Sequence, residues 1–481
     1  MKRRKKQQTA SQQTASQQTV SQPAGVKPLA FVNRQMVADW SERRLSNSLL
    51  VGWRDEDHAA PTFGFPMRAS GSAKEAANGA GVGATDSEPM LYGGDGHMLC
   101  LGPTGSGKGR GCVIPNLLLN DNPAVIVDIK GELAQVTARR RREMGHQVVI
   151  LDPFGVLDGP SDTFNPFDLF DLPDAQNDAD SEMLAELVAG GRTFKDDPFW
   201  DLTARGILSG CIAHFGSAGK GEDRSLVGVR KLMHHDDMDY QLAVMLDKKE
   251  VISSLARDEF VAYLSITSDR TRPCVRSTAQ AYLKCLGSPQ VMANLAKSSW
   301  RLQDLVDGKP LSIYLVIPPE KLVSHRVLLR IWVGVLLTAI MRRDHLPDRR
   351  TILFLDEAAA LGALTQLETA ITLLRGYGVQ TYTFWQDLSQ ISQLYPQSWQ
   401  AIVNNSSASM QVFGVSNPLM ARQIADLLGL APDDVMRLRP QELLLYQTGS
   451  GLSRCRRPDY LRDSVFTGLY DPNRRLESRS V

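Results

Sequence analysis

The residues best suited to chemistry form a glycine-rich run, Gly102-Pro-Thr-Gly-Ser-Gly107-Lys108, which follows the apolar segment Met98 to Leu101. Glycines let a loop wrap closely around phosphates, with its amide N–H groups pointing inward at the anion. The positive end of a following helix favours the same anion, and Lys108 is placed to reach the β- and γ-phosphates. We therefore predict a phosphate-binding loop here rather than an ordinary glycine-rich turn. Its residues are Gly102, Pro103, Thr104, Gly105, Ser106, Gly107, Lys108, Gly109 and Arg110.

Gly109 departs from the usual form of this motif, in which Ser or Thr follows the lysine and contributes a hydroxyl to the metal. Without that hydroxyl, Mg²⁺ lacks a common direct ligand. Thr104 or Ser106 in the loop, Asp128 further along the chain, or additional water remain as replacements. The sequence therefore predicts a looser Mg²⁺ site with slow turnover.

A phosphate loop needs a metal site and a group that activates water, and two later strands are predicted to supply them. The apolar segment Thr351 to Leu355 ends in Asp356 and Glu357. Asp356 is expected to hold Mg²⁺, and Glu357, which diverges from its neighbour at the strand end, to polarise the attacking water. Gln386 follows the segment Val379 to Trp385 and is expected to contact the γ-phosphate and the water. Each feature alone also fits a solvated strand end, so the prediction rests on their combination with the loop.

The elements that position these residues alternate between strand and helix. Alternation of this kind predicts a parallel sheet with helices on both faces, and ligands then bind at the carboxyl ends of the strands. The segment Gly131 to Met144, which has four consecutive arginines, and the segment Val327 to Met341 are predicted as helices. The predicted strands are 98–101, 124–128, 147–152, 311–317, 351–355, 379–385 and 409–413.

Between residues 167 and 300 the strand pattern stops and helical periodicity takes over, which predicts an all-α domain inserted into the sheet domain. The predicted helices there are 181–188, 199–214, 227–233, 240–246 and 280–286. The chain is predicted to begin with a disordered polar and basic tail (1–30) and an N-terminal segment (31–95) that contains a flexible loop at 69–88. The nucleotide-binding domain follows in two parts, 96–166 and 301–450, which are separated by the inserted domain (167–300). A basic C-terminal tail (451–481) ends the chain.

The composition is that of a globular chain, with 43% hydrophobic and 22% charged residues. A formal net charge of +1 argues against coating of nucleic acid by the whole surface, although a local basic channel remains compatible with it. The six cysteines show no C-x-x-C pair, which indicates a reducing compartment. The longest apolar stretch, Ile331 to Met341, is too short to span a bilayer. No apolar segment follows the basic residues Lys2 to Lys6, so no secretory signal is predicted.

Together these motifs resemble those of the coupling-protein ATPases of type IV secretion and bacterial conjugation, the TraG-like family. The resemblance covers roughly residues 90 to 450 and is far more specific than the loop alone. The segments that carry it are Gly102 to Gly111 with Val113-Ile-Pro-Asn-Leu117, Val127-Asp-Ile-Lys-Gly-Glu132, Asp197-Pro-Phe-Trp200, Phe354-Leu-Asp-Glu-Ala358 with Leu361-Gly362, Arg375-Gly-Tyr-Gly378, and Gln386.

The resemblance implies a RecA-like P-loop ATPase domain with an inserted all-α domain, assembled as a hexameric ring that uses ATP and Mg²⁺. By motif, Lys108 and the loop glycines bind phosphate, Asp356 and Glu357 serve metal and water, and Gln386 senses the γ-phosphate. Arg375 is placed to reach the nucleotide of a neighbouring subunit. In this family a glycine often follows the loop lysine, so Gly109 is a shared variant.

The implied partners are DNA, relaxosome or effector proteins, and components of a type IV secretion channel. DNA contacts are expected to be mainly to the backbone, because no base-reading motif is recognisable. Family members usually carry an N-terminal membrane anchor, whereas this chain has a polar repeat at residues 7–22. We therefore expect a cytoplasmic protein without a transmembrane segment of its own, with peripheral docking at the inner face of the bacterial inner membrane left open.

Three functions follow from these features. The first is an ATP-driven coupling protein that delivers DNA or a protein–DNA substrate to a type IV secretion or conjugation channel. The second is a soluble hexameric DNA translocase outside secretion, which the missing anchor favours. The third is a cargo receptor that binds nucleotide without hydrolysing it, which the set Asp356, Glu357 and Gln386 disfavours.

Overall fold

A computed structural model describes residues 48–54, 88–190, 198–247, 253–415 and 417–474. The predicted tail at 1–30, with the polar repeat and the basic residues Lys2 to Lys6, lies outside this part of the chain. So does the predicted flexible loop at 69–88, apart from its last residue.

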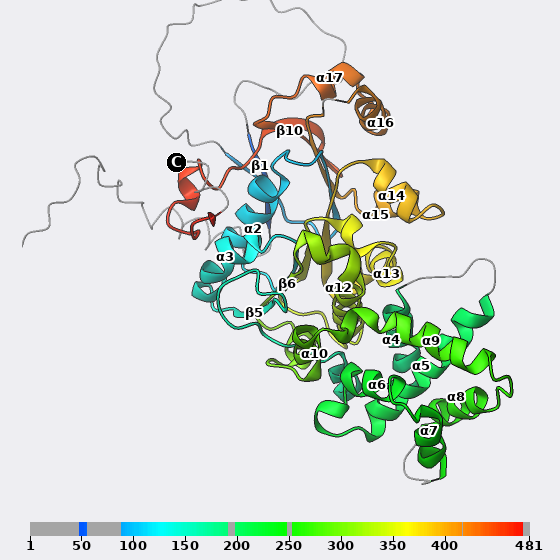
Figure 1. Ribbon diagram of the computed structural model, residues 1–481. Helices are drawn as coiled ribbons and strands as arrows, with labels where there is room; N and C mark the ends of the chain where they lie inside the picture. The colour runs from blue at the N-terminus through cyan, green and yellow to red at the C-terminus, as the bar shows by residue number, and fades with distance from the viewer. Residues whose placement is uncertain (1–47, 55–87, 191–197, 248–252, 416, 475–481) are drawn as a thin grey trace, which may run out of the picture.

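The architecture is a single eleven-stranded sheet flanked by helices (Figure 1), in the order β2-β1-β11-β10-β9-β3-β8-β7-β4-β6-β5. The strands are β1 Leu49–Trp53, β2 Pro89–Tyr92, β3 Met98–Leu101, β4 Ala124–Asp128, β5 Gln147–Leu151, β6 Leu311–Val316, β7 Thr351–Leu355, β8 Val379–Trp385, β9 Ser409–Phe413, β10 Glu442–Gln447 and β11 Gly451–Arg456. The seven strands from β9 to β5 are parallel, and the remaining pairings are antiparallel. The predicted mainly parallel sheet is confirmed.

The helices occupy both faces of the sheet. Before the helical region they are the π-helical turn η1 Gly109–Val113, α2 Ile114–Leu119 and α3 Glu132–Glu143. The helical region contains η2 Pro166–Asp171, α4 Asn177–Ala189, α5 Pro198–Ala218, η3 Gly221–Asp223, α6 Leu226–Met233, α7 Met238–Asp247, α8 Ser254–Leu264, α9 Thr271–Tyr282, η4 Lys284–Gly287, α10 Pro289–Ala296 and α11 Leu302–Val306. The rest are α12 Pro319–Ile340, η5 Ala358–Leu361, α13 Thr365–Leu373, η6 Leu374–Tyr377, α14 Leu388–Leu394, α15 Trp399–Asn405, α16 Pro418–Leu428, α17 Pro432–Met436 and η7 Ser464–Phe466.

Each central strand contributes side chains to two hydrophobic cores, because successive side chains of a strand point to opposite faces. In β3, Met98 and Cys100 join the core covered by α2 and α3, whereas Leu99 and Leu101 join the core covered by α12 and α13. Burial on both faces explains why these strands read as continuous apolar runs in the sequence.

The helical region lies between β5 and β6 and packs on the sheet domain through α12 (Figure 1). Helix α4 approaches α12 closely at Gly334, where a β-carbon would lie 2.6 Å from the Leu187 side chain. Helix α12 begins earlier than the predicted residue 327, and it bends at His325, whose backbone is not helical. By length and composition alone α12 is apolar enough to cross a membrane, but most of it is buried inside the protein, as a core helix is.

Two of the sequence predictions about secondary structure were wrong. Residues 451–474 are not a tail: β11 pairs with both β1 and β10. The arginines of β11 made it look like a solvated basic tail in the sequence, because the ion pair of Arg456 with Asp463 exists only in the folded protein. The predicted helix 280–286 is instead the end of α9 and the 3₁₀ turn η4. The buried pair Leu283 and Leu286 has the i, i+3 spacing that suits either kind of helix.

Candidate nucleotide-binding site

The predicted phosphate loop leaves the carboxyl end of β3 in the middle of the sheet and turns into η1. It is anchored to the neighbouring strand by the Gly102 N–H, which donates to the Trp385 carbonyl at 3.1 Å. Gly105 and Gly107 have φ values of +80° and +89°. Residues other than glycine rarely adopt positive φ values, so the loop requires glycine at both positions.

Two polar groups of the loop show that it fits an anion. The Lys108 ammonium donates to the carbonyl of Gly102 and, at 3.2 Å, to that of Pro103. It therefore lies back across its own loop. The Ser106 hydroxyl is buried and has no hydrogen-bond partner among the described residues. A glycine loop with a lysine across its mouth and an unsatisfied buried hydroxyl has the donor set that phosphate oxygens require.

Asp356 lies beside the loop at the end of β7, as the sequence predicted. A β-carbon added to Gly109 would lie 3.7 Å from Oδ1 of Asp356. Burial raises the pKa of Asp356 to about 6, while the charges of Lys130 and Lys108 act in the opposite direction. With this pKa most of the carboxyl group is ionised at neutral pH, and it lies beside Gly109, the position at which phosphate loops commonly carry a metal-binding hydroxyl.

No cluster of three or more His, Cys, Asp or Glu side chains that could hold a metal ion occurs in the described part of the chain. Mg²⁺ commonly binds through one or two carboxylates together with substrate phosphates and water, and needs no such cluster. Asp356 fits that pattern.

Asp128, named in the sequence analysis as a replacement ligand, is engaged elsewhere. It ends β4, next to β7, but Oδ2 accepts from the Ala134 N–H at 2.8 Å and Oδ1 from the Lys130 N–H at 3.3 Å. Burial raises the pKa of Asp128 to about 7. Its carboxylate therefore anchors the start of α3.

Glu357 and Gln386 meet at the carboxyl edge of the sheet. Strand β8 lies between β3, which leads into the loop, and β7, which leads into the acids. Gln386 Nε2 donates to Oε2 of Glu357 at 3.4 Å. The Gln386 backbone N–H donates to the Gln390 side chain at 2.9 Å, which ties the strand end to α14. Glu357 and Gln386, the two residues predicted to contact the attacking water, are thus in contact with each other.

Arg375 is not brought to this site. It lies in η6, just before β8 begins, and pairs with Asp95, just before β3 begins. Because β3 and β8 are parallel, both residues lie at the amino ends of strands whose carboxyl ends carry the loop. Within one chain Arg375 is therefore at the opposite edge of the sheet from the phosphate loop.

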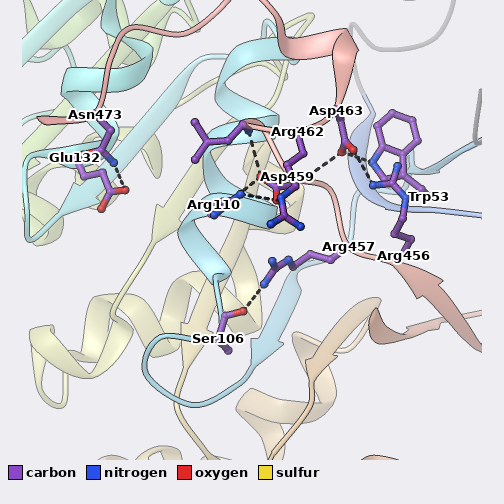
Figure 2. A network of polar contacts seen from close by, with 11 residues as sticks. Trp53, Ser106, Arg110, Glu132, Arg456, Arg457, Asp459, Arg462, Asp463 and Asn473 are labelled. Atoms are coloured by element: carbon purple, nitrogen blue, oxygen red, sulfur yellow. Dashed lines mark hydrogen bonds and ion pairs between the residues drawn. The ribbon is translucent and has the colours of Figure 1, made fainter. Parts of the chain in front are cut away.

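The sequence analysis missed the segment that follows β11. Figure 2 shows Asp459 and Arg457 of this segment beside the loop and the helix after it. Arg110 donates through Nε and Nη2 to the two Asp459 oxygens at 2.6 and 2.7 Å, so its guanidinium is committed to a carboxylate. Arg457 Nη1 donates to the Ser106 carbonyl at 2.5 Å. No local pattern marks contacts between residues that lie about 350 positions apart.

A family model described as "Type IV secretory system Conjugative DNA transfer" matches residues 68–431. The conjugal transfer protein TraG of Escherichia coli is 28% identical over 323 residues, which are 63% of this chain and 50% of that protein. The type IV secretion system-coupling protein VirD4 of Bartonella henselae is 25% identical over 303 residues, 61% of this chain and 47% of that protein. The chain thus spans about half the length of these relatives.

Among solved structures, the plasmid coupling protein TrwB in complex with ADP and Mg²⁺ superimposes with a TM-score of 0.58 and 18% identity, over 76% of this chain and 85% of that chain. The unbound TrwB structure superimposes with a TM-score of 0.57. At this level of identity the likeness establishes a shared fold: a largely parallel sheet of the RecA type with a helical region.

Proposed function

Because this chain belongs to the family of type IV secretory system conjugative DNA transfer proteins, we propose that it is an ATP-hydrolysing coupling protein. In this role it recruits DNA or a protein–DNA substrate and delivers it to a secretion channel. The observation that carries the proposal is the convergence of the phosphate loop, Asp356 and the Glu357–Gln386 contact on three neighbouring strands. A receptor that only bound nucleotide would not need this hydrolytic set.

The loop would bind the phosphates of ATP through its amide N–H groups. Lys108 would exchange the carbonyls of Gly102 and Pro103 for phosphate oxygens, which are the stronger acceptors because they are charged. Bound Mg²⁺ neutralises charge that develops on the phosphate oxygens. Asp356 would hold this ion, with water in place of the hydroxyl that Gly109 lacks.

Glu357 would accept a hydrogen bond from the attacking water and polarise it. Gln386 supports this role in two ways: its amide restrains the Glu357 carboxylate, and it offers a second polar contact to the water. Since Gln386 is tied to Gln390 in α14, a change at the γ-phosphate would be transmitted to that helix.

The proposed working form is a homohexameric ring, in which Arg375 serves the nucleotide of the adjacent subunit. Its position away from its own loop and its exposed side chain, which pairs with Asp95, support a role between subunits. The proposed partners are DNA, bound mainly through its backbone, relaxosome or effector proteins, and channel components at the cytoplasmic face of the inner membrane.

The proposal is tested by the ATPase rate of the wild type and of Lys108→Ala, each with and without single- and double-stranded DNA, beside a mass measurement of the assembly. We expect Mg²⁺-dependent hydrolysis that Lys108→Ala abolishes and DNA stimulates. No hydrolysis under any of these conditions would contradict the motor. Transfer that survives Glu357→Gln would favour a non-hydrolysing cargo receptor, and DNA translocation without co-purifying channel components would favour a soluble translocase.

A further inference from the structure

Arg457 lies against the outer side of the phosphate loop, on a backbone fixed by its own N–H, which donates to the Gln441 carbonyl at 2.7 Å. Its guanidinium donates to the Ser106 carbonyl at 2.5 Å (Figure 2). The guanidinium carbon lies 5.9 Å from the centre of the Phe413 ring at the end of β9. Arg457 thus bridges the last part of the described chain, a central strand and the loop.

Two glycines of the nucleotide site make room for this side chain. A β-carbon at Gly107 would lie 2.3 Å from Nη1 of Arg457, and one at Gly111 would lie 2.6 Å from its Cδ. Gly107 is also required by its positive φ, but Gly111 lies in η1 and its φ is not positive. The lack of a side chain at Gly111 is therefore not required by its own φ; it allows close packing of Arg457 and of the Pro458 carbonyl oxygen, which a β-carbon would meet at 2.9 Å.

The charge of Arg457 is poorly compensated in the protein itself. Within the described residues it forms no ion pair, and the nearby acid Asp459 is engaged by Arg110. Its Nε is buried and has no hydrogen-bond partner there. Burial lowers the pKa of Arg457. Placing a guanidinium in this setting costs free energy unless an anion compensates it.

Two other buried arginines, Arg141 and Arg343, have more hydrogen-bond acceptors than Arg457, whereas Arg330 shares with Arg457 a buried Nε without a partner among the described residues. Arg141 donates to the carbonyls of Asn120 and Asn122 and to the Ser312 hydroxyl. Arg343 likewise donates to several carbonyls. Both guanidinium groups are satisfied by protein acceptors, whereas Arg457 has one.

We propose that Arg457 is a positioning residue of the nucleotide site, which holds the phosphate loop from outside through the Ser106 carbonyl and adds positive charge to the phosphates of a bound nucleoside di- or triphosphate. This inference rests on the proposed ATP site and extends it to the segment after β11. Because the loop holds phosphates that ADP and ATP share, Arg457 strengthens the binding of both. It does not contact the attacking water, so the hydrolytic step at saturating ATP does not depend on it.

The test measures ADP and ATPγS binding by calorimetry on the full chain. Arg457→Gln removes the charge but keeps a hydrogen-bond donor, and Arg457→Lys keeps the charge. The matched control is Arg462→Gln, which changes an exposed arginine of the same segment that does not touch the loop. We expect Arg457→Gln to weaken both ligands about ten- to hundredfold, the loss of one charge-assisted interaction. Arg457→Lys should lose less affinity for both ligands, and Arg462→Gln should bind them with the affinity of the wild type. KM for ATP should rise while kcat is kept.

Several results would overturn the inference. One is that Arg457→Gln binds nucleotide with wild-type affinity. Another is that Arg457→Gln and Arg457→Lys lose equal affinity and both melt at a lower temperature without ligand, which would mark Arg457 as a merely structural residue. If Arg457→Gln fails to fold, Arg457→Lys decides: a fall in affinity smaller than that expected for Arg457→Gln, with an unchanged ligand-free melting temperature, sustains the inference, and unchanged affinity refutes it. If the wild type, like the Lys108→Ala control, binds no nucleotide, the proposed function is refuted as well. If the wild type binds nucleotide and Arg457→Gln binds it equally well, only this inference is refuted.

Discussion

Gly109 lies beside the carboxylate of Asp356. A β-carbon on Gly109 would lie 3.7 Å from Oδ1 of Asp356, and outside its own helix it would meet no other described atom within 4 Å. This is the position at which phosphate loops commonly place a metal-binding hydroxyl. In the proposed metal site, Asp356 therefore offers a carboxylate and position 109 offers no ligand atom.

Gly109→Ser should supply that atom. Because the φ of Gly109 is not positive and an added β-carbon would meet Asp356 only at van der Waals distance, the serine should be accommodated without strain. We expect the Mg²⁺ concentration for half-maximal ATP hydrolysis to fall by roughly tenfold, the effect of one added metal ligand worth about 1.4 kcal/mol. Gly109→Ala fills the same space without a hydroxyl and should behave as the wild type. Equal Mg²⁺ dependence in both variants and the wild type would show that position 109 does not face the metal.

Glu357→Gln should separate binding from hydrolysis. It preserves the shape of the side chain and removes the charge that polarises water, so kcat should fall by about 10²- to 10⁴-fold while ATPγS affinity stays unchanged. Gln386→Ala should lower kcat in the same direction, since it releases the Glu357 carboxylate. Gln390→Ala, which removes only a backbone contact of Gln386, is the control and should change kcat little. A parallel loss of affinity in Glu357→Gln would place this residue in the binding site instead.

Arg375→Ala should act between subunits. Because Arg375 lies at the far edge of the sheet from its own loop, nucleotide affinity of the dilute chain should be unchanged, while hydrolysis by the assembled ring falls about 10³-fold. Mixing Arg375→Ala with Lys108→Ala should restore part of the rate, since each variant supplies what the other lacks. Asp95→Asn removes the partner of Arg375 and should keep most activity. Failure of the mixture to recover activity would contradict a role across the interface.

Acid should destabilise the fold through two buried histidines. Burial lowers the pKa of His97 and of His146 from 6.5 to about 4. His97 Nδ1 accepts the Thr381 N–H at 3.0 Å, and His146 contacts the Arg141 guanidinium, so each ring is held neutral. The unfolded chain takes up protons near pH 6.5. The stability gained from neutral rings is therefore present above that pH and is lost as the pH falls toward 4, by up to about 3 kcal/mol for each histidine.

Thermal melting between pH 7.5 and pH 4.5 measures this loss. His97→Asn keeps an acceptor near the Nδ1 position and cannot be protonated, so its melting temperature should depend less on pH than that of the wild type. His235→Asn, at an exposed histidine, should leave the pH dependence unchanged. The same pH dependence in all three proteins would contradict this account.

Much of the sheet could be predicted because its central strands are buried on both faces. The segments of β4, β7, β8 and β9 are predicted with the bounds that the structure has. The apolar runs of β4 and β7 end at acidic residues, and β8 is followed by Gln386. The sequence thus located Glu357 and Gln386 at strand ends, but their mutual contact came only from the structure. Strands with one polar face, such as β11, gave no such signal.

The contacts of Arg110 and Arg457 could not be predicted for a different reason. Each depends on a partner about 350 positions away, and an arginine-rich segment has the same composition whether its charges are solvated or paired. Only the folded chain distinguishes Arg457, which lacks an ion-pair partner among the described residues, from Arg456, which pairs with Asp463. Patterns in sequence report burial and local geometry, and long-range pairing of charges lies beyond them.

The sheet order also affects how the protein is made. Strand β3 carries the phosphate loop and leaves the ribosome early, but the strands on its two sides, β8 and β9, come from residues 379–413. At about 5–20 residues per second, this leaves an apolar strand without either neighbour for roughly 15 to 60 seconds of synthesis. During that interval the apolar side chains of β3 lack the neighbouring strands that bury them in the fold. Translation that stops anywhere in the helical region releases a fragment that contains the loop motif but cannot form the site.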